Sequence, residues 1–425
     1  MIIRFRRRTQ SSKLILFVPI MSVVFTGLID AIPGASAIKY TIDIAWCWLL
    51  ILLIINNRQF PNTHSRTLAR IVGLFAASTL VGLVLQYQSL LYYAWGVRNN
   101  LRFFVFFFAC IFFLKKDDAE TGIKMLDSLF WINIPIFLVQ YLFLGIEQDY
   151  LGGIFGTTKG CNGYLNVFLV IVISKSVLQY VHGKETARMC FAKCAIVLLF
   201  GLLAELKVFF VEFVIIVAMA FLMSKFNSRK LMLVLSAILG LSVTLWVFSQ
   251  MFPHFGRWFS LEGIFRIIGN KRGYTNANDL NRLTAIPEIL QDYLKSGVEK
   301  LFGLGMGNCD TATFTFLQTP FYHQHKLTHY HWFSSAFMFL ETGVIGFGLY
   351  LLFFVYVYIE ADRREKNGLA DSLDCQHAKI MAIMSLLLIF YNASMRTEAA
   401  YMLYFVMSIP FAMDDKALQS KIVQI

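Results

Sequence analysis

The sequence predicts an all-α, polytopic integral membrane protein with about twelve transmembrane helices and one large external loop. The 425 residues are 57% hydrophobic and only 15% charged, and the mean hydropathy is +0.62. A soluble domain is about half apolar and about a quarter charged, so this composition excludes a soluble fold. The apolar residues occur in runs of roughly 16 to 22, which as helices are long enough to cross a hydrocarbon core of about 30 Å.

The predicted spans follow these apolar runs along the chain. They cover residues 14–30, 40–55, 70–87, 99–114, 126–145, 163–181, 191–204, 207–224, 231–252, 332–358, 378–393 and 398–413. The chain contains no internal repeat, low-complexity tract or long polar linker, so residues 1–425 are expected to form a single membrane domain. Residues 253–331 form the large loop between two spans.

The distribution of Lys and Arg predicts the orientation, because short cytoplasmic loops retain the positive charges. The basic residues gather in alternate connections, at residues 4–13, 58–70, 115–124, 184–193, 225–230 and 363–379. Both termini are therefore expected in the cytoplasm and residues 253–331 outside. The N-terminus also resembles a signal peptide ending at Ala35-Ser36-Ala37, but its long apolar run favours retention as the first helix.

The net charge of +12 is accounted for largely by the same inner connections. A nucleic acid is therefore not expected as a partner, whereas the lipid bilayer is.

The external loop contains an amphipathic pattern that begins at Asp279. Apolar residues recur at helical spacing at Leu283, Ile286, Leu290, Tyr293 and Leu294. This spacing predicts a helix whose apolar face packs on the membrane domain or lies in the interface. Arg282 would lie near its beginning, and Pro287 is tolerated in the first turn or two.

Gly303, Gly305 and Gly307 follow in the sequence GLGMG. No strand precedes them and no βαβ helix follows, so a nucleotide-binding loop is not indicated. We expect a tight turn that permits a close backbone approach, including approach to a substrate.

Four histidines precede the tenth span: His323, His325, His329 and His331. Four imidazoles could bind a transition metal, but their spacing matches no zinc motif and no cysteine or carboxylate accompanies them. One histidine acting as a general base is the simpler hypothesis. No metal and no cofactor is therefore expected.

Arg282, the helix after it, the GLGMG turn, His331 and the segment Glu341-Thr342-Gly343-Val344-Ile345-Gly346 together resemble the O-antigen polymerase and O-antigen ligase superfamily (Wzy and WaaL type). In that family a histidine precedes a similar E-x-G motif that enters a transmembrane helix. Here His331 precedes Glu341 by one residue more than usual, and Trp332 holds the commoner position, so His329 is the alternative.

Two further segments resemble the same family. Residues 149–156, which begin at Asp149, look like the family's D-x-x-G-x-F-G loop, with one residue more between the first glycine and the phenylalanine. Lys207 stands close to where many members have an arginine.

The resemblance implies a fold like that of class C glycosyltransferases and a metal-independent, inverting glycosyl transfer. The donor would be an oligosaccharide linked to undecaprenyl pyrophosphate, and the reaction would take place at the outer face of a bacterial inner membrane. A chain-length regulator and a flippase would be partners. No D-x-D motif occurs, so arginine would stabilise the leaving pyrophosphate, which its planar guanidinium can bind with two hydrogen bonds.

His331, with His329 as the alternative, is the predicted base, and Arg282 is the predicted catalytic cation. The predicted substrate-binding residues are Lys207, Arg98, Arg102, Arg396, Asp149, Glu341, Gly303 and Gly305. For Arg98, Arg102 and Arg396 the alternative to substrate binding is ordinary snorkelling at a helix end. For Lys207 it is an ion pair with Glu205 or Glu212.

Glu341 is expected to orient the loop or a histidine, with a role in helix entry as the alternative.

The favoured function is a polysaccharide repeat-unit polymerase, because the chain is divergent and rich in phenylalanine like the polymerases. A ligase that transfers the glycan to the lipid A core shares the motifs. A polysaccharide flippase or other transporter is the alternative from a different class, and it would require a cavity that opens to both sides by turns.

Overall fold

The computed structural model describes residues 16–32, 41–55, 63–224, 227–251, 279–312 and 314–412. In these ranges the chain is helical and contains no β-strand, which confirms the all-α prediction for this part. The principal helices are α2 (Thr26–Ala31), α3 (Thr41–Ile55), α4 (Thr63–Leu85), α5 (Leu90–Phe113), α6 (Lys116–Leu142), α7 (Cys161–Val181), α8 (Ala187–Leu203), α9 (Lys207–Met223), α10 (Ser228–Met251), α16 (Ser334–Lys366), α17 (Ser372–Tyr391) and α18 (Ala400–Ser408).

Within the described ranges, seven helices are long and apolar enough to cross a membrane. They are α4, α5, α6, α7, α10, α16 and α17. Each of the twelve predicted spans coincides with helical backbone over most of its described length, but α2, α3, α8, α9 and α18 are shorter than 18 residues. A membrane protein with several spans is therefore supported, whereas the number twelve and the orientation stay predictions.

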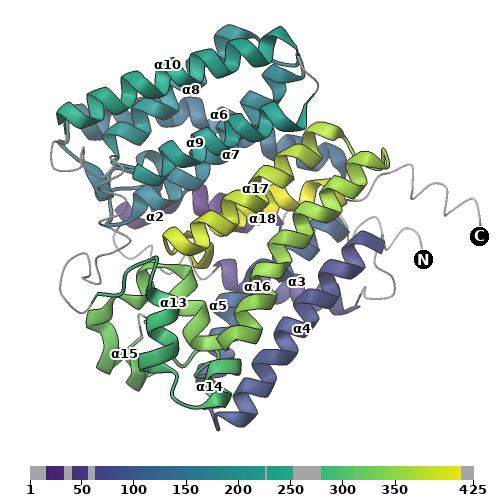
Figure 1. The fold of residues 1–425 in the computed structure, drawn as a ribbon, viewed down its shortest axis with the longest axis vertical. Coiled ribbons are helices and arrows are strands. Elements are labelled where there is room, and N and C mark those ends of the chain that lie inside the picture. The colour runs from purple at the N-terminus through teal and green to yellow at the C-terminus, as the bar shows by residue number, and fades with distance from the viewer. Residues whose placement is uncertain are drawn as a thin grey trace, which may run out of the picture.

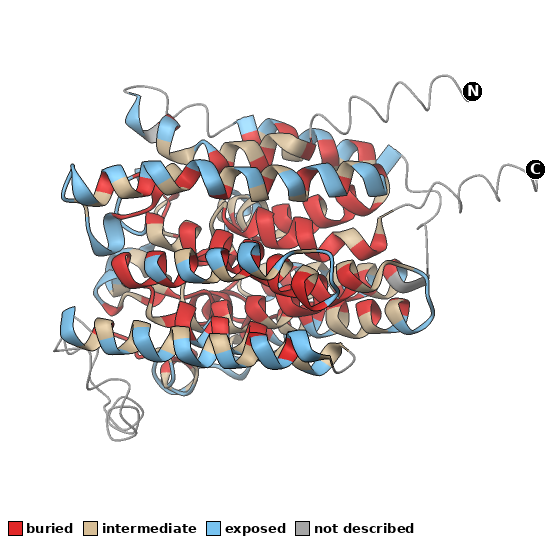
Figure 2. Cartoon of the chain, turned by 90° about the horizontal axis from the view of Figure 1, so that it is seen from above, coloured by how far each residue is buried: buried red, intermediate tan, exposed pale blue. Residues whose placement is uncertain are grey.

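The helices form a bundle with a central and a peripheral set (Figures 1 and 2). In the most apolar stretch of α7, 83% of the residues are buried, whereas in that of α10 only 11% are. The outward side chains of α10 are nevertheless large and apolar, including Leu235, Leu239 and Trp246. Water would not favour such a surface, so the outer faces of the bundle are suited to lipid.

Aromatic rings fill the interface among α5, α16 and α18. The ring of Phe353 lies 4.8 Å from that of Phe104 and 5.2 Å from that of Phe107, both close to perpendicular. Tyr404 packs against the same group, stacked on Phe353 at 5.9 Å. Edge-to-face packing of this kind favours fixed ring positions, so the phenylalanine-rich segment of α5 forms part of the core.

The outer segment consists of short helices rather than one amphipathic helix. These are α13 (Ala285–Glu288), which continues as a π-helical turn (Ile289–Tyr293), α14 (Gly297–Phe302) and α15 (Pro320–His325). Ile289 and Leu294 are buried, but Leu283 is 59% exposed. Its predicted place on the packed face was wrong, because α13 begins only after Leu283. Residues 253–278 of the predicted loop lie outside the described residues.

The GLGMG turn packs directly against a break in α16. Gly303 has a φ of +75° and Gly343, inside α16, a φ of +61°. A Cβ on Gly303 would lie 2.4 Å from the carbonyl carbon of Glu341, and the Gly305 N–H donates to the Glu341 carbonyl at 3.1 Å. The predicted tight turn is present, and the close approach that its glycines permit is to protein backbone.

Candidate functional site

The candidate residues gather at one end of the bundle, where α16 begins and α17 ends. Residues 279–331 pack at this end (Figure 1), which we call the loop end. The N–H of Ser334, the first residue of α16, donates to the carbonyl of Asn392 just after α17 at 3.0 Å. This contact brings the histidine segment beside the connection that carries Arg396.

Arg98 makes a closed ion pair. Its Nε and Nη2 donate to the two carboxylate oxygens of Asp43 on α3, at 2.8 and 2.6 Å. The guanidinium also lies 4.8 Å from the ring of Trp95. Arg98 therefore joins α5 to α3 instead of snorkelling, and its charge is already balanced.

Arg102 is also balanced by a carboxylate. It is 4% exposed, and its Nη2 lies 3.0 Å from Glu398 Oε1. Glu398 accepts a second hydrogen bond from the Tyr164 hydroxyl at 2.8 Å. Arg102 thus ties α5 to the connection before α18, and Tyr164 adds α7 to the same network.

Arg396 differs from these two arginines. It ends a 3₁₀ turn (Ser394–Arg396) between α17 and α18, and its guanidinium lies over the ring of Phe337. Asp310 and Glu341 act on it electrostatically, yet among the described residues no carboxylate oxygen lies within 4.0 Å of it. Burial lowers the pKa of Arg396, which remains a strong base and therefore a cation. This charge is available to an anionic ligand.

Glu341 holds the loop rather than a histidine. Its Oε1 accepts from the Cys309 N–H at 3.2 Å, and its Oε2 accepts from Asn100 Nδ2 at 3.4 Å. Next to Cys309, Asp310 accepts from Asn99 Nδ2 at 2.7 Å. Of the two roles expected of Glu341, orientation of the loop is the one that these bonds favour.

His329 has a buried carboxylate behind it. Its Nδ1 lies 2.6 Å from Oδ1 of Asp279, whose side chain is fully buried. The imidazole stacks on Trp332, with 3.9 Å between ring centroids and an angle of 20°. The residue has a φ of +52°, an uncommon conformation for a residue other than glycine. These contacts hold the ring in one orientation.

His331 has a different environment. Burial, Arg396 and His329 lower its pKa to about 4. Its Nδ1 is buried and has no hydrogen-bond partner within the described part of the chain. At this pKa the His331 imidazole is neutral at pH 7 and is a weaker base than one with a pKa near 7, so its role as the general base stays a prediction.

The other two histidines have ordinary surroundings. His323 is exposed, and His325 packs 4.5 Å from the ring of Phe321 and 5.2 Å from that of Tyr293. Across residues 279–312 and 314–412, as in the other described ranges, no three His, Cys, Asp or Glu side chains are placed to hold a metal ion.

Arg282 and Lys207 form a second cationic group at the loop end. The guanidinium of Arg282 lies 4.7 Å from the ring of Tyr391, the last residue of α17. Lys207 Nζ lies 3.9 Å from Glu205, and Arg282 and Asp149 are both electrostatic neighbours of Lys207. Arg396 acts electrostatically on His331, so Arg396 is a further candidate, beside Arg282, for the catalytic cation.

Glu212 is not the partner of Lys207, because its carboxylate accepts from Asn166 at 2.9 Å. Asp149 accepts from Asn162 at the start of α7 at 3.0 Å. The loop that begins at Asp149 is thereby attached to the same end of the bundle.

Four carboxylates of this end were missed in the sequence: Asp43, Asp279, Asp310 and Glu398. Two of them stand close to predicted residues, since Asp279 precedes Arg282 by three positions and Glu398 follows Arg396 by two. That proximity was the available signal. The partners of Asp43 and Asp310 are distant in the sequence.

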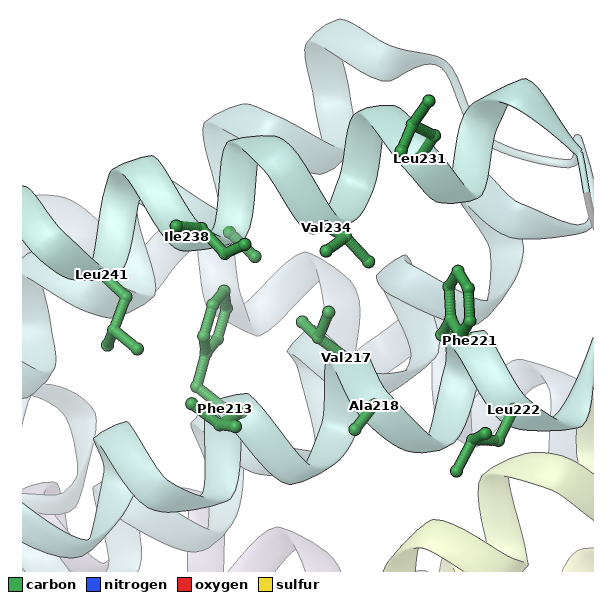
Figure 3. A pocket seen from close by; sticks show the side chains of 11 residues that line it. Phe213, Val217, Ala218, Phe221, Leu222, Leu231, Val234, Ile238 and Leu241 are labelled. Carbon is green, nitrogen blue, oxygen red and sulfur yellow. The ribbon is translucent and has the colours of Figure 1, made fainter.

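An apolar pocket of about 480 Å³ lies between α9 and α10, away from these residues. Phe213 and Val217 on α9 face Val234 and Ile238 on α10 across it (Figure 3). Its lining includes no titratable side chain, so the pocket offers a ligand no acid, base or cation. No protein-family model and no curated protein matches the chain.

Proposed function

We propose that the protein is a polysaccharide repeat-unit polymerase. It transfers a glycan from undecaprenyl pyrophosphate to a lipid-linked acceptor at the outer face of a bacterial inner membrane. The observation that carries the proposal is the position of Arg396, a half-buried cation with no ion pair among the described residues, beside His331. A polar, anionic donor on a lipid anchor requires cations and a base at one end of a membrane bundle.

The proposed reaction is a single displacement. The acceptor hydroxyl oxygen attacks the anomeric carbon, and its proton passes to a histidine. The bond between that carbon and the pyrophosphate oxygen breaks, and the pyrophosphate leaves with the electron pair. Attack from the opposite side inverts the anomeric configuration.

Arg396 is the first candidate for stabilising the leaving pyrophosphate, followed by Arg282 and Lys207. Arg98 and Arg102 are weaker candidates, because Asp43 and Glu398 already neutralise them. A fixed guanidinium stabilises charge that develops in the transition state, and loss of one such donor costs about 10²- to 10³-fold in rate. Arg98 and Arg102 are therefore assigned to the scaffold of the site.

The test uses purified protein with a native lipid-linked repeat unit and a ladder gel. Wild-type protein should produce a ladder, and Arg396→Ala should lose at least about 10²-fold in rate. Lys300→Ala is the matched control, because it removes an exposed cation of the same outer segment. A wild-type protein that extends no lipid-linked acceptor would contradict the proposal, as would an Arg396→Ala variant with a normal ladder.

An O-antigen ligase is the second candidate, since the same residues suit a lipid A core acceptor. A ligase adds one glycan to that acceptor and produces no ladder from repeat units alone. In the polymerase, a chain-length regulator would control product length and a flippase would supply the substrate. A flippase would require a cavity that opens to both sides by turns, and the pocket between α9 and α10 offers a polar glycan no charged lining.

A further inference from the structure

His329 and Asp279 form a dyad that the spacing of the sequence does not reveal. They are 50 positions apart, yet His329 Nδ1 lies 2.6 Å from Asp279 Oδ1. The backbone holds the two segments together, because the Leu280 N–H donates to the Thr328 carbonyl at 2.9 Å. A backbone hydrogen bond thus joins Leu280, which follows Asp279, to Thr328, which precedes His329.

This contact determines the tautomer of His329. An ionised carboxylate has no proton to give, so Asp279 accepts the proton of Nδ1. In the neutral imidazole Nε2 then carries the lone pair and can accept a proton. Trp332 stacks on the ring and limits its rotation, so the direction of the Nε2 lone pair is also constrained.

The titratable groups around His329 come from two segments. Asp279 precedes α13, and His331 lies in the same segment as His329, with 6.0 Å between ring centroids. Arg396, from the connection between α17 and α18, acts on His331. His331 thus lies beside the cation, whereas His329 has the carboxylate.

We propose that Asp279 is a positioning residue and that His329, rather than His331, takes the proton from the acceptor hydroxyl at Nε2. The proposal rests on the proposed glycosyl transfer. Asp279 keeps its own charge throughout and stabilises the imidazolium that forms. His331 is left as a neutral side chain beside Arg396, where it is suited to a hydrogen bond with bound substrate.

The kinetic test uses paired variants in the ladder assay. Asp279→Asn should lower kcat by about 10²- to 10⁴-fold, because the amide can donate to Nδ1 and place the ring proton on Nε2. KM for the lipid-linked donor should stay within about twofold. Asp279→Glu should recover part of the rate, whereas Asp292→Asn, an exposed change in the same outer segment, should have no effect.

Variants of the two histidines complete that test. His329→Ala should abolish polymerisation, and His331→Ala should leave measurable activity. The opposite order would overturn the assignment of the base.

A second measurement does not depend on activity. Nitrogen-15 solid-state NMR of the full chain in bilayers at alkaline pH reports the tautomer of each histidine, and His329→Gln identifies the signal. Wild-type His329 should carry its proton on Nδ1, and Asp279→Asn should move it to Nε2. An unchanged tautomer in Asp279→Asn would overturn the role of Asp279, and so would a shifted tautomer with unchanged kcat. A wild-type protein without polymerase activity would instead contradict the proposed function.

Discussion

Arg102 and Glu398 form an ion pair, with 3.0 Å between Nη2 and Oε1, that joins the loop end of α5 to the connection before α18. Arg102 is buried, whereas the Glu398 side chain is 32% exposed. The same guanidinium donates to the carbonyl of Arg396 at 3.3 Å. The pair therefore fixes the backbone that carries the proposed phosphate-binding cation.

Glu398→Gln is expected to lower the free energy of unfolding by about 3 kcal/mol, because it leaves Arg102 buried without its counter-charge. Thermal unfolding in detergent measures this change. Glu120→Gln is the control, since it removes the exposed pair with Lys124 on α6 and should change stability by less than about 0.5 kcal/mol. Equal losses in the two variants would contradict the structural importance of the Arg102 pair.

Low pH should weaken the stabilisation that the Arg102–Glu398 ion pair provides. Burial alone would raise the pKa of Glu398, but Arg102 and Tyr164 lower it to about 2 from an ordinary value of 4.5. A carboxyl with a depressed pKa stabilises the fold above its ordinary pKa, and this contribution decreases as the pH falls through the folded value. Stability should therefore decline between pH 4.5 and pH 2, and Glu398→Gln should flatten that part of the profile. Parallel profiles for wild type and variant would argue against the pair as the cause.

Gly303→Ala is expected to destabilise the protein by at least about 1 kcal/mol. The added Cβ would lie 2.4 Å from the Glu341 carbonyl carbon, at a φ of +75°. Gly297→Ala on α14 is the matched control, because its Cβ would meet nothing within 4 Å, and it should be neutral or slightly stabilising. Protein yield and unfolding temperature in detergent distinguish the two. A Gly303→Ala variant as stable as wild type would show that the turn can move away from α16.

The sequence predicted the helices because their signal is local. A run of apolar residues suffices for a membrane helix, and each of the twelve segments is helical over most of the residues that the structure describes. The partners of the site residues were not predictable in this way. Asp43 meets Arg98 and Asp279 meets His329 across 55 and 50 positions, and neither distance is a helical or strand spacing. Only packing brings such pairs together.

Leu283 shows that periodicity alone does not predict where a helix begins. Its spacing matched the apolar face, but α13 begins two residues later and Leu283 remains exposed. Helix boundaries depend on capping and tertiary contacts more than on periodicity.

The proposed orientation predicts which positions an impermeant maleimide reaches on intact spheroplasts. In a background without the native cysteines, Lys159→Cys and Lys300→Cys should be labelled, because both positions are exposed at the loop end. Lys116→Cys, exposed at the start of α6, should be labelled only after permeabilisation. Labelling of Lys116→Cys but not Lys159→Cys in intact cells would reverse the orientation and with it the compartment of the reaction.

Removal of metal ions should leave the reaction rate unchanged. The proposed mechanism uses arginine in place of a metal, and the described histidines do not converge on one point with other ligands. A strong chelator added to the ladder assay tests this expectation, followed by readdition of Mg²⁺, Mn²⁺ or Zn²⁺. Activity that chelation abolishes and one metal restores would revive the hypothesis that the histidine segment binds a metal.

Arg282 offers the sharpest test of guanidinium geometry at the loop end. Its guanidinium packs 4.7 Å from the Tyr391 ring and is an electrostatic neighbour of Lys207, so two cations from separate segments lie near one another. Glu205 and Asp149 also act on Lys207, and a pyrophosphate with its two phosphoryl groups offers hydrogen-bond acceptors to both cations.

Arg282→Ala is therefore expected to lower kcat/KM for the lipid-linked donor by about 10²-fold or more. Arg282→Lys keeps the charge but loses the planar fork, so it should restore only a small part of that activity. Lys295→Ala, which removes an exposed cation of the same segment, is the control for a general effect of charge. Initial rates at several donor concentrations, with membrane insertion checked by the yield of folded protein, measure the effect. Full polymer length and rate in Arg282→Ala would exclude Arg282 from pyrophosphate binding and leave Arg396 as the principal cation of the site.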